Sequence, residues 1–287
     1  MLRAADISAF LKRNPMAIAA ELTVVRGSSP REAGTFMLVG PTDLIGTIGG
    51  GALEHMVIER ARQVMRTGET GDDLDVPLGP EIGQCCGGRV NVEMRIVDRT
   101  KAEALIARAA AEEAAQPSVF VFGAGHVGQA LARSLALLPL KVTVVDTRPD
   151  ELEGLPAGIG AKVTAMPEAV VRNALDGSAY VVLTHDHALD FLICAEALGR
   201  PDAPYVGMIG SRTKKARFST WFKGEGGDSE ALQRLVMPIG AQGLGDKRPE
   251  VIAALAAAEI MVHIGRREVE TGARPVTEGK VRAVHGR

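Results

Sequence analysis

The segment of this sequence with the most unusual chemistry is Gly83-Gln84-Cys85-Cys86-Gly87-Gly88, a pair of adjacent cysteines between glycines. Glycines leave the backbone open, so we expect both thiols to be accessible. A nearby arginine or helix N-terminus would favour the thiolate, which attacks sulfur or binds a soft metal. The segment has no C-x-x-C pair and no four-ligand set, which argues against structural zinc. The alternative is a buried turn of small residues.

A glycine loop in the second half is the next candidate site. Gly123-Ala124-Gly125-His126-Val127-Gly128 fits G-x-G-x-x-G between a predicted strand and a predicted helix. Gly123, Gly125 and Gly128 would permit a tight turn and close approach of a diphosphate to the helix N-terminus. Asp146 ends the next strand, where an acidic side chain accepts from a ribose-like hydroxyl. The pattern predicts a Rossmann-type half. It leaves open whether the loop binds NAD, another diphosphate compound or nothing.

Two loops in the first half are candidate anion sites. The triplet Gly49-Gly50-Gly51 precedes a predicted helix, where successive backbone N–H groups can form a nest for phosphate. Its alternative role is to permit close backbone packing. Arg26, Ser28 and Arg31 lie between two predicted strands, where guanidinium and hydroxyl groups can bind an anion. The alternative for that loop is a turn with exposed charges.

Polar residues follow two apolar strands in the second half. Thr184-His185-Asp186-His187 comes after one strand and Gly210-Ser211-Arg212 after the next. The carboxyl ends of such strands line the ligand crevice of doubly wound sheets. We therefore expect His185, Asp186 and Ser211 to position a ligand. The histidines have no clear third ligand, which argues against a metal site. Lys214 and Lys215 are expected on an exposed helix face.

The elements that must position these residues differ between the two halves. In the first half, the pattern predicts a helix over 4–12, strands ending at 25, over 36–39 and over 44–48, a helix over 52–67, a polar loop, and a strand over 90–96. An Ala- and Glu-rich helix over 101–115 ends at Pro117. In the second half, strands over 119–122, 142–145, 162–165, 180–183 and 205–209 alternate with helices, and a last helix covers 250–264.

This pattern predicts an α/β protein with a small N-terminal α/β domain and a C-terminal Rossmann-like, doubly wound parallel sheet. The expected boundaries are 1–100 for the first domain, 101–117 for a helical linker, 118–265 for the Rossmann-like domain and 266–287 for a frayed basic tail. Cys194 falls in a predicted helix and is expected in the core. Trp221 and Phe222 are candidates for either the core or an interface.

Composition narrows the class of protein. The chain has 287 residues, of which 46% are hydrophobic and 24% charged, with a net charge of −2. Such a balance gives no bulk basic surface, so neither nucleic acid nor a membrane is expected as a partner. No apolar run approaches the roughly 20 residues needed to span a bilayer. Charged residues near the N-terminus interrupt any signal peptide, and three cysteines cannot form a disulfide framework. We expect a cytoplasmic protein.

Taken together, these segments resemble the xanthine dehydrogenase accessory protein family (XdhC/CoxI). The glycine triplet and the Cys-Cys loop are the most specific motifs. The segments that carry the resemblance are residues 25–31, 46–54, 83–88, 123–128, 184–186, 207–211 and 238–240. Residues 241–249 depart from the family pattern, so ligand contacts there are not carried over.

The resemblance implies a maturation factor for molybdenum hydroxylases, with no catalysis of its own. Such a protein binds the molybdenum cofactor, protects it while a cysteine desulfurase supplies the sulfido ligand, and delivers it to apo xanthine dehydrogenase. A homodimer is implied as well. The loops described above would bind the cofactor, and Cys85 or Cys86 would ligate or guard its molybdenum.

Two other functions compete with this interpretation. An NAD(P)-dependent oxidoreductase would use the Rossmann loop, with His185, Asp186 and His187 as proton-transfer groups. It leaves the Cys-Cys loop and the glycine triplet unexplained, so NAD(P) is the less favoured cofactor. The other is a structural adaptor between the desulfurase and the target enzyme, which would bind neither the molybdenum cofactor nor NAD(P).

Overall fold

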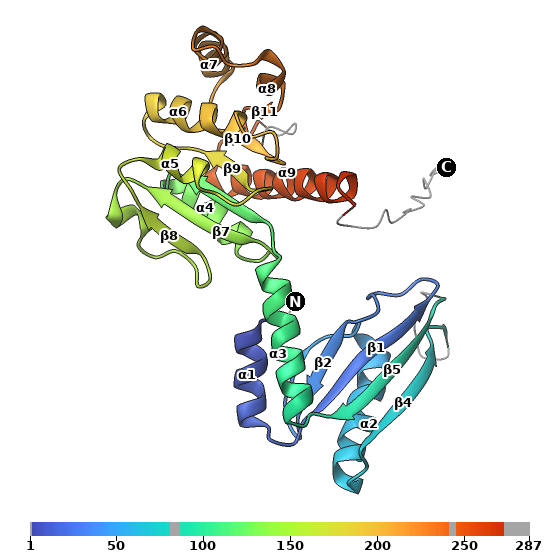
Figure 1. Cartoon of the computed structure of the whole chain (residues 1–287). Helices are drawn as coiled ribbons and strands as arrows, with labels where there is room; N and C mark the ends of the chain where they lie inside the picture. Colours follow the sequence, from blue (N-terminus) through green and yellow to red (C-terminus); the bar gives the residue numbers. More distant parts are fainter. Residues whose placement is uncertain (1, 81–86, 241–244, 273–287) are drawn as a thin grey trace. The chain divides into compact units, whose positions relative to one another are not determined.

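The structure is a computed structural model that describes residues 2–80, 87–240 and 245–272. The chain divides into two compact units, Met1–Ala115 and Gln116–Arg287. Each unit has its own sheet and its own buried core, so each is described by itself (Figure 1).

The first unit is an antiparallel sheet with helices on both faces. Its strand order is β3-β2-β1-β5-β4, and every neighbouring pair is antiparallel. The helices are α1 (Ala4–Arg13), α2 (Gly51–Thr67) and α3 (Arg99–Ala114), and the strands are β1 (Ile18–Arg26), β2 (Phe36–Val39), β3 (Leu44–Gly46), β4 (Gly71–Pro77) and β5 (Arg89–Ile96).

Side chains alternate between the two faces of this sheet. Ile18 and Ala20 of β1 pack with Leu53 of α2, whereas Ala19 packs with Phe10 of α1 and Leu105 of α3. Successive strand residues point to opposite faces, so both faces of β1 are buried over Ile18, Ala19 and Ala20. This double burial explains why β1 begins with a continuous apolar run.

Strand β4 was predicted as a polar loop, and that prediction is wrong. Asp72, Asp73 and Asp75 argue against a strand by composition. In the structure they form ion pairs: Asp72 with Arg60 of α2, and Asp73 with Arg95 of β5 at 2.8 Å. β4 is an edge strand, where charged side chains are common because they oppose edge-to-edge association.

The helix predicted as a linker belongs to the first unit instead. Leu105 and Ala109 of α3 are buried against α1, and the backbone N–H of Ala4 donates to Glu113 at 2.6 Å. The Arg108 guanidinium donates to Glu21 of β1 and lies 4.5 Å from the centre of the Phe36 ring. These contacts fix α3 on the sheet.

The second unit is a six-stranded parallel sheet. Its strand order is β11-β10-β9-β6-β7-β8, so the chain runs outward from β6 to one edge and then from β9 to the other. This order is that of a doubly wound dinucleotide-binding fold, and it places the switch point between β6 and β9. The strands are β6 (Ser118–Phe122), β7 (Lys141–Asp146), β8 (Gly160–Val163), β9 (Ala179–Val182), β10 (Val206–Met208) and β11 (Leu235–Val236).

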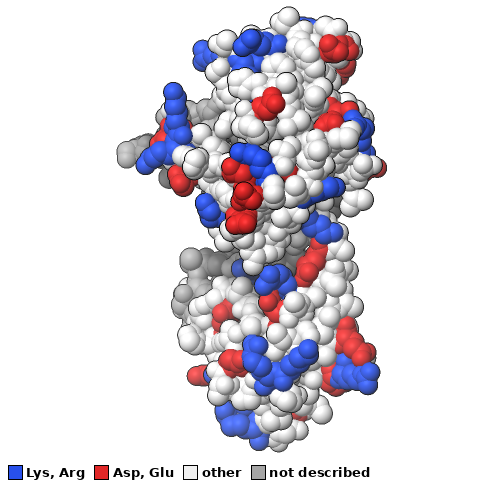
Figure 2. Space-filling view, turned by 90° about the vertical axis from the view of Figure 1, so that its left-hand side faces the viewer, with Lys and Arg blue, Asp and Glu red and all other residues white. Residues whose placement is uncertain are grey.

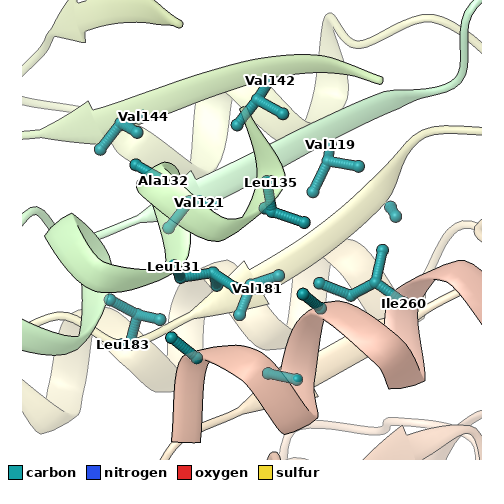
Figure 3. Packing of buried hydrophobic residues seen from close by; sticks show 14 of the residues in the cluster. Val119, Val121, Leu131, Ala132, Leu135, Val142, Val144, Val181, Leu183 and Ile260 are labelled. Carbon is teal, nitrogen blue, oxygen red and sulfur yellow. The ribbon is translucent and has the colours of Figure 1, made fainter. Parts of the chain in front are cut away.

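Helices cover both faces of the parallel sheet. On one face, Val121 and Val181 pack with Leu131 of α4 and Ile260 of α9 (Figure 3). On the other face, Val182 packs in a second core with residues of α5, α6 and α7. The helical segments are α4 (His126–Leu135), the 3-10 helix η2 (Pro149–Leu152), α5 (Pro167–Arg172), α6 (His187–Leu198), α7 (Arg212–Gly224), α8 (Ser229–Gln233) and α9 (Pro249–Glu270).

Helix α9 continues into the segment predicted as a frayed tail. The tail was expected from residue 266, but the helix ends only at Glu270. Gly265 lies inside the helix, and the residue that follows the cap is Gly272, with φ 73°. Left-handed glycines commonly end helices. Among the described residues, no helix combines the length and apolar character needed to cross a bilayer.

Candidate functional site

The glycine loop of the second unit connects β6 to α4 and has one open position. A Cβ on Gly128 would lie 2.0 Å from the carbonyl oxygen of Gly123, and a Cβ on Gly123 would lie 2.4 Å from that of Leu183. A Cβ on Gly125 would meet none of the described residues within 4 Å. Gly123 and Gly128 are therefore required by packing. Gly125 keeps the backbone accessible at the N-terminus of α4, where phosphate binding is favourable.

Asp146 stabilises this loop from the end of β7. Its Oδ2 accepts from the backbone N–H of Ala124 at 2.8 Å, and its Oδ1 accepts from the backbone N–H and Nε of Arg148 at 3.0 and 3.1 Å. Burial opposes ionisation of Asp146, but the hydrogen bonds from Arg148 and Ala124 outweigh it and hold the pKa below its usual value. The carboxylate predicted to accept from a ribose thus already accepts from the chain. Arg148, whose side chain is 40% exposed, is the cationic group beside it.

The polar residues after β9 and β10 include two helix caps. Asp186 accepts from the backbone N–H of Ala188 at 2.8 Å, at the start of α6. Ser211 accepts from the backbone N–H of Lys214 at 3.2 Å, at the start of α7. Both have a structural role that the sequence analysis did not assign to them. His185 is exposed and has no partner within the described residues.

A buried ion pair connects these two loops. Lys214 donates to the carboxylate of Asp190 and, at 3.1 Å, to the carbonyl of Ile209. Asp190 also accepts from the backbone N–H and hydroxyl of Thr184, at 2.9 and 2.7 Å. The expectation that Lys214 lies on an exposed face is wrong, because its side chain is only 10% exposed. The sequence signal that was missed is Asp190 itself, a carboxylate among apolar residues of α6.

A pocket of about 530 Å³ opens between α6 and α7. Its apolar lining comes from Phe191 and Leu192 of α6 and from Trp221 of α7, and its polar lining includes Ser211 and Arg217. Of the predicted site residues, Ser211 lines this pocket, and Asp186 caps the helix that forms one wall. Arg217 was not predicted as a site residue, and Trp221 was predicted only as a core or interface residue.

Cys194 is a core residue, as predicted. It is fully buried in α6, and burial raises the pKa of its thiol. A neutral, inaccessible thiol of this kind neither ligates a metal nor attacks sulfur. Among the described residues, no group of three His, Cys, Asp or Glu side chains is placed to hold a metal ion.

In the first unit, the glycine triplet forms a nest whose occupant is Glu54. Glu54 Oε1 accepts from the backbone N–H groups of Ile48 and Gly50, both at 2.9 Å, and from the Thr47 hydroxyl. Burial opposes ionisation of Glu54, but these hydrogen bonds outweigh it and lower the pKa. The nest predicted for phosphate therefore holds a carboxylate of the same chain. Gly49, Gly50 and Gly51 all have positive φ, which explains the glycines.

Three predicted motifs meet in the first unit. A Cβ on Gly49 would lie 2.7 Å from Pro30, so the triplet contacts the loop that carries Arg26, Ser28 and Arg31. A Cβ on Gly88 would lie 2.1 Å from the carbonyl oxygen of Ser28, so the same loop contacts the end of the Cys-Cys segment. The Arg31 guanidinium is exposed and has no partner in the described part of the chain. Cys85 and Cys86 lie outside the described residues.

Charge on the visible surface is mixed. On the face shown in Figure 2, Lys and Arg are interspersed with Asp and Glu among the described residues. A nucleic-acid-binding protein characteristically gathers its basic side chains in a stripe or patch. The face in view does not have this arrangement.

Comparison with known proteins agrees with both units. Residues 119–260 match the XdhC Rossmann domain, and residues 13–75 match the XdhC and CoxI family. An uncharacterized protein of Escherichia coli K12, YqeB, is 28% identical over 84% of this chain and 42% of its own length, so this chain spans less than half of that relative. A chain from Bacillus halodurans described as a xanthine dehydrogenase has a TM-score of 0.78 at 17% identity, covering 94% of this chain and 98% of that one, a likeness that shows the fold alone. Because a model of this family matches each of the two units, the chain belongs to the XdhC and CoxI family.

Proposed function

We propose that this chain is a maturation factor for xanthine dehydrogenase or a related molybdenum hydroxylase. It binds the molybdenum cofactor, protects it while a cysteine desulfurase supplies the terminal sulfido ligand, and delivers it to the apo-enzyme. The chain itself would then be a carrier with no turnover of its own. Family membership supports the maturation role. The geometry of the second unit supports the binding step.

The open backbone at Gly125 is the observation that carries the proposal. The cofactor has a pterin ring system, a phosphate and a molybdenum centre held by two sulfur atoms. An anionic phosphate can approach the N-terminus of α4, because none of the described residues lies within 4 Å of a Cβ built on Gly125. Arg148 at the neighbouring strand end already pairs with Asp146 and Glu151. The phosphate would therefore be held by the backbone N–H groups at the start of α4.

Binding of the molybdenum end is assigned to the Cys-Cys segment. Thiolates suit a soft, sulfur-rich metal centre. The described end of that segment, Gly87 and Gly88, lies against the loop that carries Ser28. Cys85 or Cys86 would ligate or guard the metal during sulfuration. Replacing both cysteines by alanine should weaken cofactor binding, and unchanged binding and sulfuration would refute this part of the proposal.

An NAD(P)-dependent oxidoreductase is the second candidate, because the strand order and the glycine loop are those of dinucleotide-binding folds. The hydrogen bonds of Asp146 count against this candidate, since a ribose hydroxyl would have to displace Ala124 or Arg148 from the carboxylate.

The partners proposed for the maturation factor are the cysteine desulfurase, the molybdenum-binding enzyme and a second copy of this chain. Nucleic acid and membrane are not among them, and the proposed location is the cytoplasm.

Equilibrium binding separates the two candidates. Isolated molybdenum cofactor is titrated anaerobically onto the protein, and NAD and NADP are titrated in parallel. A carrier should bind close to one cofactor per chain, and Gly125→Ala should weaken this binding. Gly224→Ala is the control, because a Cβ at Gly224 also meets none of the described residues within 4 Å. Tight NAD(P) binding without cofactor binding would replace the proposal with the oxidoreductase.

A further inference from the structure

The pocket between α6 and α7 has the size and the lining of a small-molecule site. Its volume of about 530 Å³ falls within the range of roughly 300–1,000 Å³ typical of ligand pockets. It lies where β9 and β10 end and their helices begin, at the same edge of the sheet as the glycine loop. β9 is also the strand that pairs with β6, which carries that loop.

Aromatic rings form one wall of the pocket. Phe191 and Trp221 lie with ring centres 5.4 Å apart, and Phe218 supports both from below, at 5.2 and 6.0 Å. The chain is poor in aromatic residues, which make up 3% of the sequence, so three rings together are a notable concentration. A half-buried indole supported in this way is a surface on which a flat ring can stack.

Within the described part of the chain, the polar lining has one cation without a partner. Arg217 lies one turn before Trp221 on α7, and its guanidinium has no hydrogen-bond or ion-pair partner among the described residues. Lys214, the other cation of the lining, is neutralised by Asp190. Arg217 is thus the group available to an oxygen of the ligand, and an ionised guanidinium donates strong, charge-assisted hydrogen bonds.

Contacts within the chain hold the two walls of the pocket together. Asp190 joins the start of α6 to Lys214 of α7, and Phe218 is fully buried beneath the rings. A preformed wall does not have to be ordered when a ligand binds, so less of the binding free energy is lost.

We propose that the α6–α7 pocket binds a flat heteroaromatic ring, which stacks on Trp221 and accepts a charge-assisted hydrogen bond from Arg217 through an exocyclic oxygen. This assignment rests on the proposed function in naming the pterin of the molybdenum cofactor as the ring. A purine nucleotide shares the same chemistry. A site for a partner protein is the competing use of the pocket.

Trp221 reports directly on the test, because it is the single tryptophan of the chain. The intact protein is titrated with 6-carboxypterin and, separately, with GMP, and the indole fluorescence is followed. Free tryptophan amide under the same conditions corrects for light absorbed by the ligands. The variant Arg217→Gln removes the pairing charge, and Lys223→Gln removes an exposed charge at the far end of the same helix.

The pterin should quench Trp221 saturably, GMP should bind more weakly, and Arg217→Gln should weaken pterin binding about tenfold, the loss expected for one charge-assisted hydrogen bond. Lys223→Gln should bind the pterin as the wild type does.

Saturable quenching by GMP alone would overturn the pterin assignment. Quenching by neither compound, or equal affinity in Arg217→Gln, would overturn the pocket. Cofactor that binds the wild type and Arg217→Gln equally well would refute the pocket and leave the proposed function standing. Cofactor that does not bind the wild type would refute both.

Discussion

Lys214 and Asp190 form a buried ion pair between the first turns of α7 and α6, and their side chains are 10% and 0% exposed. A buried pair of this kind fixes geometry. Removing one partner leaves the other charge without compensation in a medium of low polarity. In this unit it fixes Thr184 on one side and the start of α7 on the other.

Lys214→Met should lower the free energy of unfolding by about 3–5 kcal/mol, because the Asp190 carboxylate would then be buried without its cation. Urea denaturation of the variant against the wild type gives this difference. The double variant Asp190→Asn/Lys214→Met should recover part of the loss. A single variant as stable as the wild type would show that the pair has no structural role.

The glycine loop gives a matched pair of substitutions. Gly128→Ala should lower the free energy of unfolding markedly, since its Cβ would lie 2.0 Å from a backbone oxygen. Gly125→Ala should leave the free energy of unfolding unchanged or raise it by roughly 0.4–1 kcal/mol, because alanine lowers the conformational entropy of the unfolded chain. The folded chain can accept alanine there, since φ of Gly125 is −65° and a Cβ has space. Thermal denaturation of both variants tests this contrast. Equal destabilisation would mean that Gly125 is also required by packing.

Glu54 predicts a dependence of stability on pH. Its pKa in the folded protein lies below the ordinary value of 4.5, so its contribution is fully present above that value and is lost as pH falls through the folded pKa. Glu54→Gln should cost about 1–3 kcal/mol at pH 7, the contribution of hydrogen bonds to a charged group. The difference from the wild type should shrink in acid. A difference that stays constant down to pH 3 would contradict the account.

Asp146→Asn tests whether this carboxylate serves the fold or a ligand. If it supports the glycine loop, the ligand-free variant should be less stable by about 1–3 kcal/mol, because an amide oxygen replaces only one of the two acceptors. Asp150→Asn, an exposed residue of η2, is the control for the change in charge. Unchanged stability of Asp146→Asn would restore the interpretation that the carboxylate is reserved for a ribose hydroxyl.

The sequence was sufficient to predict β6, β7, β9 and β10, because parallel strands buried on both faces are continuous apolar runs. It missed the two-residue strand β11 and placed the exposed strand β8 two residues too late. It failed at β4, whose aspartates are compatible with a strand only because Arg60 and Arg95 lie opposite. It also predicted β3 up to Ile48, whereas the strand ends at Gly46, where φ is 85°.

The candidate site was predicted less well than the fold. The pattern identified the open backbone at Gly125. It did not reveal that Glu54, four residues after Gly50, occupies the glycine nest and competes there with any external anion. Nor could spacing reveal that Asp190 and Lys214 pair, or that Trp221 and Phe191 meet, since these contacts join α6 and α7 across the fold. Local motifs thus located the loops, while the partners of their side chains depended on tertiary packing.

Delivery is the central claim, and reactivation of an apo-enzyme tests it most directly. Apo xanthine dehydrogenase is mixed under anaerobic conditions with sulfurated molybdenum cofactor, either free or first bound to this chain in equal amount, and the recovery of xanthine oxidation is followed. The account predicts faster and more complete recovery from the bound cofactor, and a loss of that advantage with Gly125→Ala. Equal recovery from free and bound cofactor would contradict it.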